Sequence, residues 1–254
     1  VLLRGAKDSS LLGNTVLDNS GGGMLLETVG SAETSATSVL SNTISGNGQY
    51  GLRLSGALTT TLEGNVVGLD AARRNPLGNT GNGIEIFDSQ NTLASDTYVA
   101  GNTGAGIVVS GTSTISTSIR NAYIGLALSA SGVLSETAAN GLEGLRITGG
   151  PQRTEVVGGL FGGNSAAANG PAGVLIQATS GVTVTGVTIG GARAENSPNS
   201  PPTLARPFGP GISVSGPLTD VQLIGNVLRF NRGPGILVSG DADRVLMRDN
   251  RLAQ

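Results

Sequence analysis

The sequence predicts an all-β fold, a parallel β-helix of about eight or nine coils with three short strands in each coil. A four-residue pattern of glycine, apolar residue, any residue and apolar residue recurs at eight glycines that are spaced 23 to 38 residues apart. An asparagine stands four residues before seven of these eight glycines. The 3.6-residue period of a helix persists nowhere, which excludes an α-solenoid. The glycines are Gly23, Gly51, Gly83, Gly106, Gly144, Gly173, Gly211 and Gly235.

Each of these glycines opens a strand whose two apolar residues are expected to point into the core. Stacked coils place equivalent residues in columns, about 4.8 Å apart. Burial contributes about 1.5–3 kcal/mol for each side chain. The first column is Met24, Leu52, Ile84, Ile107, Leu145, Val174, Ile212 and Ile236, and the second is Leu26, Leu54, Ile86, Val109, Ile147, Ile176, Val214 and Val238.

Two sets of residues mark the corners of the coil. The asparagines before the glycines are expected to form an amide ladder that satisfies buried backbone groups, and they are Asn19, Asn47, Asn79, Asn102, Asn140, Asn169 and Asn231. The second set precedes the third strand of the coil and comprises Asn42, Asn65, Asp96, Asn121, Gly159, Gly186, Asn226 and Asn250. Asparagine and glycine suit such corners because they tolerate the left-handed backbone conformation.

The spacing between glycines shows where the coils carry extra residues. Gly83 and Gly106 are 23 residues apart and Gly211 and Gly235 are 24 apart, too short for a propeller blade. Longer coils carry inserts at approximately 68–79, 126–140, 160–169 and 190–209, all between the second corner and the next glycine. Because the coils stack in register, we expect these loops along one edge of the rod.

In solenoids, function tends to lie where such inserts gather. We therefore predict a ligand- or partner-binding edge, with solvated loops that only keep the rod soluble as the alternative. The candidate binding residues are Asp70, Arg73, Arg74, Glu136, Phe161, Arg193, Glu195, Arg206 and Phe208.

The outward positions of the glycine-led strands form a second candidate surface. They are Leu25, Arg53, Glu85, Val108, Arg146, Leu175, Ser213 and Leu237, of which half are apolar. An apolar stripe on an outward face indicates a packing contact, and a homotrimer is one natural form of it. Glu85 is expected to pair with Arg53 or Arg146 in this column.

Composition excludes several classes of function. The net charge of −2 gives no basic field for nucleic acid, and no apolar run approaches the roughly 20 residues of a membrane span. The absence of His and Cys removes Ser-His-Asp and Cys-His catalysis as well as the usual transition-metal ligands. We expect no metal and no cofactor. Since the chain opens at Val1 inside an apolar stretch, we expect a single domain, residues 1–254, from a longer protein.

Carboxylates are the remaining route to catalysis, either as a hydrolytic pair or as ligands of a Ca²⁺-assisted lyase. Outward-facing candidates are Glu63, Glu85, Asp88, Asp96, Glu143 and Glu155. The local pair in DADR, residues 241–244, is interpreted as a turn.

The repeats NTISGNGQYGLRL and NVLRFNRGPGILV resemble those of right-handed parallel β-helices in the pectin-lyase-like superfamily. Residues 156–191 and 209–231 are similar in style to the coils of phage tailspikes and tail fibres. Signature motifs of the galacturonases, epimerases and pectate lyases are absent. The resemblance implies a module of a virion spike or another extracellular appendage that binds cell-surface polysaccharide or a receptor. A polysaccharide lyase or glycoside hydrolase, and a purely structural stalk or adhesin, are the alternatives.

Overall fold

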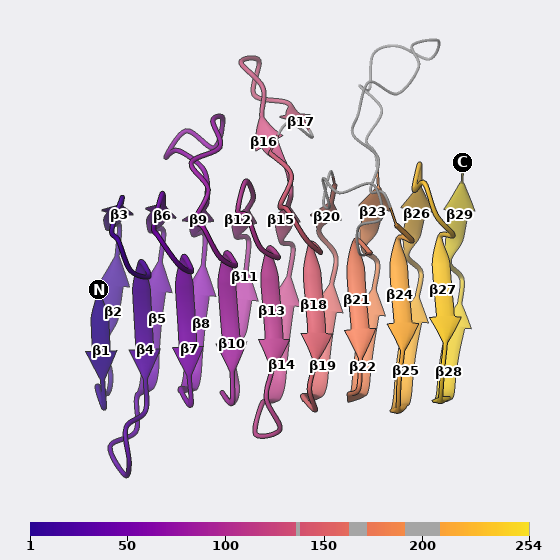
Figure 1. The fold of residues 1–254 in the computed structure, drawn as a ribbon, viewed down its shortest axis with the longest axis horizontal. Helices are drawn as coiled ribbons and strands as arrows, with labels where there is room; N and C mark the ends of the chain where they lie inside the picture. Colours follow the sequence, from indigo (N-terminus) through magenta and orange to yellow (C-terminus); the bar gives the residue numbers. More distant parts are fainter. Residues whose placement is uncertain (136–137, 163–171, 191–208, 254) are drawn as a thin grey trace.

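The chain is a right-handed parallel β-helix, as the sequence predicts (Figure 1). The computed structural model describes residues 1–135, 138–162, 172–190 and 209–253. Over these residues the chain forms no helix, and its strands make three parallel sheets of nine strands and one small hairpin. Each sheet takes one strand from every coil, so the described residues make nine coils, which follow one another from left to right in Figure 1.

The three sheets are named in the order in which each coil enters them. Sheet A holds the glycine-led strands β1 (Leu2–Arg4), β4 (Met24–Glu27), β7 (Leu52–Ser55), β10 (Ile84–Phe87), β13 (Ile107–Ser110), β18 (Leu145–Thr148), β21 (Val174–Gln177), β24 (Ile212–Ser215) and β27 (Ile236–Ser239). Sheet B holds β2 (Ser10–Leu12), β5 (Ser35–Leu40), β8 (Leu58–Glu63), β11 (Leu93–Ser95), β14 (Ile115–Arg120), β19 (Gln152–Val157), β22 (Ser180–Thr185), β25 (Leu218–Ile224) and β28 (Ala242–Arg248).

Sheet C closes each coil and leads to the next one. It holds β3 (Thr15–Leu17), β6 (Thr43–Ser45), β9 (Val66–Val67), β12 (Tyr98–Val99), β15 (Tyr123–Ile124), β20 (Leu160–Phe161), β23 (Thr188–Gly190), β26 (Val227–Arg229) and β29 (Arg251–Ala253). The remaining strands, β16 (Ala127–Leu128) and β17 (Leu134–Ser135), pair antiparallel in the hairpin.

The core columns predicted for the glycine-led strands are confirmed up to β24, whereas on the last coil Ile236 is partly buried and Val238 is exposed. Ile84 pairs in register with Leu52 on one side and Ile107 on the other. Every residue of the first column from Met24 to Ile212 is fully buried. These side chains join the inward residues of sheets B and C in one continuous hydrophobic core.

The leading glycines are required by close packing between coils, a different reason from the one the sequence suggested. A Cβ at Gly51 would lie 2.5 Å from Val67 Cγ1 and 2.7 Å from the carbonyl oxygen of Gly83. Gly51 is not among the residues with positive φ, so its backbone would accept any side chain. The neighbouring coil leaves no room for a side chain, and that excludes every other residue.

The amide ladder predicted for the first corner is confirmed from Asn19 to Asn140, whereas the Oδ1 atom of Asn231 is buried and has no hydrogen-bond partner among the described residues. The Asn47 side-chain amide donates to Asn79 Oδ1 at 2.8 Å, and the Asn79 amide donates to Asn102 Oδ1 at 2.8 Å. The backbone N–H of Asn47 donates to the same Asn79 oxygen at 3.0 Å. Each carboxamide therefore links two coils, and none of these asparagines has a positive φ. Asn169 lies outside the described residues.

The second corner, where the sequence predicts turn residues, holds a similar ladder in the first three and the last two coils, and three of its predicted residues, Asp96, Asn121 and Gly186, lie one residue before the ladder position. Asn226 donates to Asn250 Oδ1 at 3.0 Å, and Asn42 donates to Asn65 Oδ1 at 3.1 Å. In the next two coils Asp96 and Asn121 adopt positive φ and precede the ladder position. Because side chains alternate along a strand, this shift turns Tyr98 and Tyr123 outward and puts Val99 and Ile124 in the core.

The inserts that the structure describes emerge along one edge, as predicted. The loop between β9 and β10 and the β16–β17 hairpin both rise above sheet C at the upper edge of Figure 1. They touch, because the backbone N–H of Leu128 donates to the carbonyl oxygen of Arg73 at 2.7 Å. A smaller loop, residues 28–34, leaves the rod at the opposite edge.

Candidate functional site

The first insert, residues 68–79, is a built loop whose turn is organised by Asp70. The Asp70 carboxylate accepts a hydrogen bond from the backbone N–H of Arg74 at 2.8 Å and another from the Asn75 side-chain amide. The backbone N–H of Arg73 donates to the Asp70 carbonyl at 2.8 Å. Partial burial raises the pKa of Asp70, but these hydrogen bonds outweigh it and leave the pKa below its ordinary value. Asp70 is therefore a turn-forming residue.

Arg73 ties this insert to the outer face of sheet C. Its guanidinium lies 4.7 Å from the centre of the Tyr98 ring, a cation–π distance. Tyr98 in turn stacks on Tyr123, with ring centres 4.5 Å apart and planes inclined by 13°. Both tyrosines are partly buried and come from adjacent coils. The stack fixes the base of the insert, so Arg73 has a structural role besides any contact with a ligand.

Arg74 is the candidate arginine whose side chain is free to act. It is exposed, and only its backbone N–H is hydrogen-bonded among the described residues. The inserts also expose apolar side chains, since Leu77 is 44% exposed and Val133, in the loop of the β16–β17 hairpin, is 57% exposed. The edge thus presents a cation, two exposed apolar side chains and the rims of two tyrosines.

The structure places only some of the predicted binding residues at this edge. Asp70, Arg73 and Arg74 lie together in the first insert. Phe161 does not belong there: it is on β20 with its ring in the hydrophobic core, 1% exposed. Its position two residues after a corner turns it inward, so its aromatic side chain packs against the core and not against a ligand. The other candidates, Glu136, Arg193, Glu195, Arg206 and Phe208, lie outside the described residues.

A second cluster, which the sequence analysis missed, lies on the outer face of sheet A. The Arg53 guanidinium is 5.8 Å from the Tyr50 ring centre and 5.7 Å from that of Phe87. Arg53 also pairs with Glu85 at 3.4 Å, and the Asn82 side chain donates to Glu85 at 2.8 Å. Two of the seven aromatic residues stand beside one outward arginine, a proximity that becomes evident once the strand register is known.

The electrostatics of this cluster keep the Tyr50 phenol protonated. Burial raises the pKa of Tyr50, Arg53 lowers it, and Glu85 and Glu27 raise it again, so that the pKa lies above its ordinary value. A protonated phenol donates hydrogen bonds and suits recognition or acid catalysis better than base catalysis.

The outward carboxylates of sheets A and B are largely engaged with neighbours. Glu85 pairs with Arg53 and not with Arg146, because Val108 of the intervening coil separates them. Arg146 instead forms two hydrogen bonds to Glu143, which is almost fully buried. Glu155 pairs with Arg120 at 2.6 Å. No cluster of three metal-ligating side chains occurs among the described residues.

Comparisons with known proteins agree with the fold. The family model described as periplasmic copper-binding protein (NosD) matches residues 1–126. No curated protein matches the sequence. The described residues contain no helix that is long and apolar enough to cross a membrane.

Solved structures similar to this chain are polysaccharide-acting enzymes and a phage tailspike. The alginate lyase from Paenibacillus sp. str. FPU-7 is 13% identical, with a TM-score of 0.66 over 100% of this chain and 88% of that one. The A-module of the mannuronan C-5 epimerase AlgE4 of Azotobacter vinelandii is 15% identical, with a TM-score of 0.54 over 94% and 76%. Tailspike protein 2 of the Escherichia coli O157:H7 bacteriophage CAB120 is 11% identical, with a TM-score of 0.53 over 94% and 34%.

These likenesses define the class of the protein, a right-handed parallel β-helix. At such identities they show the fold alone, and the chain spans about a third of the tailspike. The copper named in the family description does not fit the residues of this chain. Copper is held by imidazole, thiolate and thioether groups, whereas the chain has no His, no Cys and only two Met. Met24 is fully buried in the core, and Met247 lies on the last coil without a second soft ligand.

Proposed function

We propose that this chain is a β-helix module that binds polysaccharide outside the cytoplasm, as part of a virion spike or another extracellular appendage, and that it binds with its insertion edge. The observation that carries the proposal is the joining of two inserts along one edge, where the Arg73 carbonyl meets the β16–β17 hairpin. Proteins of this fold that act on polysaccharides or serve as tailspikes support it.

The charge of the edge favours an acidic glycan. Arg74 offers an exposed guanidinium on the same insert whose Arg73 covers the Tyr98 ring, and such cations bind carboxylate or sulfate groups. The Asp70 carboxylate is turned to its own loop and does not oppose such a ligand.

The test is binding to immobilised acidic polysaccharides by an Arg74→Glu variant. Loss of a charge-assisted contact and its replacement by repulsion is expected to weaken binding at least about tenfold. Arg153→Glu is the matched control, because Arg153 is exposed on sheet B, away from the inserts. Equal binding by both variants and the native protein contradicts the edge assignment.

One alternative, a polysaccharide lyase, is favoured by the cluster on sheet A. The Arg53 guanidinium makes one ion pair, of 3.4 Å, with Glu85, and the protonated Tyr50 phenol lies beside it. Together they offer a cation for a uronate carboxylate and a proton donor. Incubation with acidic polysaccharides, followed by measurement of chain length, tests this reading: shortening that disappears in Arg53→Ala supports the enzyme, and no shortening leaves the binding module.

A structural stalk is the other alternative, and it makes the opposite prediction for the edge. If the inserts only decorate the rod, replacing residues 70–75 with a short Gly-Asn turn leaves attachment to cells intact. If the insertion edge binds, attachment is lost while the circular dichroism of the β-helix stays the same.

We further propose that the chain self-associates through the outward column of sheet A. The pairing of the strands puts Leu25, Leu175 and Leu237 on that face, although the ion pair of Arg53 and Glu85 interrupts the column and Val108 is buried. Leu175→Asp should convert an oligomer into a monomer in light scattering, whereas Thr183→Asp on sheet B should not. A native protein that is monomeric at high concentration refutes this association.

A further inference from the structure

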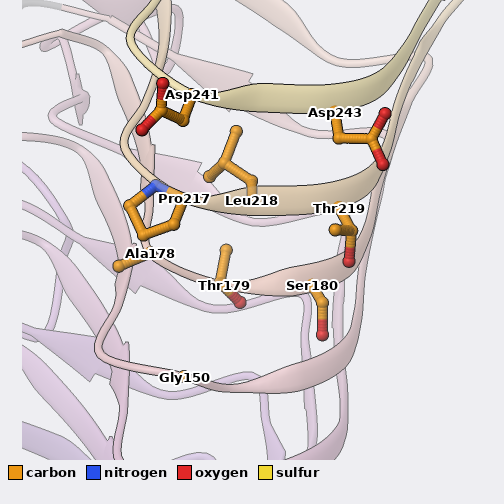
Figure 2. A pocket seen from close by; sticks show the side chains of 9 residues that line it. All are labelled: Gly150, Ala178, Thr179, Ser180, Pro217, Leu218, Thr219, Asp241 and Asp243. Carbon is orange, nitrogen blue, oxygen red and sulfur yellow. The ribbon is translucent and has the colours of Figure 1, made fainter.

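An open groove of about 410 Å³ crosses the last four coils at the corner between sheets A and B, away from both surfaces described above. Figure 2 shows its rungs one above another, with Asp241 and Asp243 on the last coil, Pro217 and Thr219 below them, and Gly150 at the far end. The remaining lining residues are Ala178, Thr179, Ser180 and Leu218.

The polar side of the groove is a ladder of side chains whose hydrogen-bonding capacity is unused. Ser180 pairs in register with Thr219, and Thr219 with Asp243, so the three stand in one column about 4.8 Å apart. Within the described part of the chain, the Ser180 and Thr219 hydroxyls and the Asp241 carboxylate have no side-chain partner. Asp243 has one long ion pair, 3.8 Å from Arg244. Hydroxyls and carboxylates thus face the groove ready to bind a ligand.

The other side of the groove is apolar and shallow. Pro217 is exposed and Ala178 is half-buried, while Leu218 is buried behind them. Thr179 is satisfied internally, because its hydroxyl donates to the Pro151 carbonyl. Gly150, with φ +96°, adds no side chain and leaves the far end open. The groove therefore combines a flat apolar shelf with a row of hydrogen-bonding groups.

Charge decides which ligand suits this lining. Both ionisable groups of the groove are carboxylates, and the nearby Arg244 is held by Asp220 through hydrogen bonds of 2.6 and 2.8 Å. An anion would be repelled. Ca²⁺ is held by several carboxylate oxygens that converge on one point, whereas Asp241 and Asp243 lie at opposite ends of their rung and point apart (Figure 2). A sugar ring presents apolar C–H groups on its face and hydroxyls on its rim, and carboxylates accept hydrogen bonds from hydroxyls strongly.

We propose that this groove binds a neutral saccharide, with the sugar face on Pro217 and the hydroxyls held by Asp243, Thr219 and Ser180. The site is independent of the insertion edge, whose exposed arginine favours acidic glycans. The chain would thereby carry two saccharide sites, one for acidic and one for neutral sugars, and could bind a heteropolysaccharide at two points.

The test is a titration of the ¹⁵N-labelled full chain, followed by amide chemical shifts. The probes are maltohexaose, cellohexaose, mannohexaose and N-acetylchitohexaose, with a hexagalacturonate and CaCl₂ alone as comparisons. We expect at least one neutral hexasaccharide to give saturable shifts at Ser180, Thr219 and Asp243, and the hexagalacturonate to give none there. Asp243→Asn should weaken binding about tenfold, since it loses a charged acceptor.

Asp249→Asn is the matched control, because Asp249 lies on the same coil outside the groove, and its positive φ suits asparagine. It should bind as the native chain does. The proposal is overturned if all four neutral sugars give no saturable shifts in the groove, or if Asp243→Asn binds unchanged. Stronger shifts with the hexagalacturonate, or shifts at Asp241 and Asp243 with CaCl₂ alone, also overturn it. Arg74→Glu should not affect this binding, so failure here and failure of the insertion edge can be told apart.

Discussion

Threonines stacked inside the rod give the sharpest prediction about its stability. One inward column of sheet B reads Thr37, Thr60, Thr92, Thr117, Thr154, Val182, Val221 and Val245. The hydroxyls of Thr60, Thr92, Thr117 and Thr154 are buried and have no hydrogen-bond partner. Valine, which has the same shape, fills this column in the last three coils. Thr117→Val should therefore stabilise the protein.

The size of the effect follows from the surroundings of Thr117. Its side chain is 1% exposed and lies between Thr92 and Thr154 of the adjacent coils, and burying an unpaired hydroxyl costs about 1–3 kcal/mol in proteins. Replacing the hydroxyl by a methyl group removes that cost and adds buried apolar surface. The free energy of unfolding should rise by about 1–3 kcal/mol, and the Tm by about 2–4 °C for each kcal/mol in a chain of this size.

Thermal and urea denaturation measure the change, and hydrogen exchange of the β14 amides locates it, because solenoid stability is carried between neighbouring coils. Thr61→Val is the control: Thr61 pairs on the outward column and its change should stay within about 0.5 kcal/mol. If Thr117→Val lowers the free energy of unfolding by 1 kcal/mol or more, with Thr61→Val neutral, the hydroxyl is hydrogen-bonded in the folded protein and the reasoning fails.

Three further predictions concern the corners and the first insert. Asn79→Ala should lower the free energy of unfolding, measured by urea denaturation, by about 3 kcal/mol or more, because it leaves the buried donors of Asn47 on the preceding coil unpaired. Asn19→Ala, at the exposed end of the ladder, should lower it far less. Equal losses for the two variants would contradict the ladder. Arg73→Ala should speed proteolysis within residues 68–79 by freeing the insert from the stacked tyrosines, at a cost of about 1 kcal/mol, whereas Arg74→Ala should not. The folded-state pKa of Asp70 lies below its unfolded value. The contribution of Asp70 to stability is therefore complete above about pH 4 and is lost as the pH falls through the folded pKa. Cleavage of the insert by an acid protease should increase in that range, and Asp70→Asn should abolish this pH dependence.

The repeats predicted the fold well because every coil packs against its neighbours in the same way. A strand that stacks on its equivalent must carry an apolar residue at the same position, so the columns beginning at Met24 and Leu26 can be recognised in the sequence. The asparagine ladder can be recognised for the same reason, since each side-chain amide donates a hydrogen bond to another asparagine one coil away. The location of the inserts followed from the same register.

The sequence was less informative where one residue decides the side of a strand. Treating Asp96 and Asn121 as corner residues equivalent to Asn65 hid the outward direction of Tyr98 and Tyr123, and therefore their stacking with Arg73. Phe161 was misplaced for a related reason: its proximity to an insert suggested the surface, but the alternation of the strand points it inward. Tyr50 and Phe87 were overlooked because 37 residues separate them in the chain.

The sequence by itself determined the architecture of this protein, the number of its coils to within one, its core columns and the edge that carries inserts, because every coil repeats the same packing requirements. The tertiary structure decided which side chains meet across coils. Arg73 reaches Tyr98, Arg53 lies between Tyr50 and Phe87, and Ser180, Thr219 and Asp243 align in one groove, since side chains distant in the sequence come within reach only when the coils are stacked in register. The binding sites proposed for this rod depend on those contacts between coils.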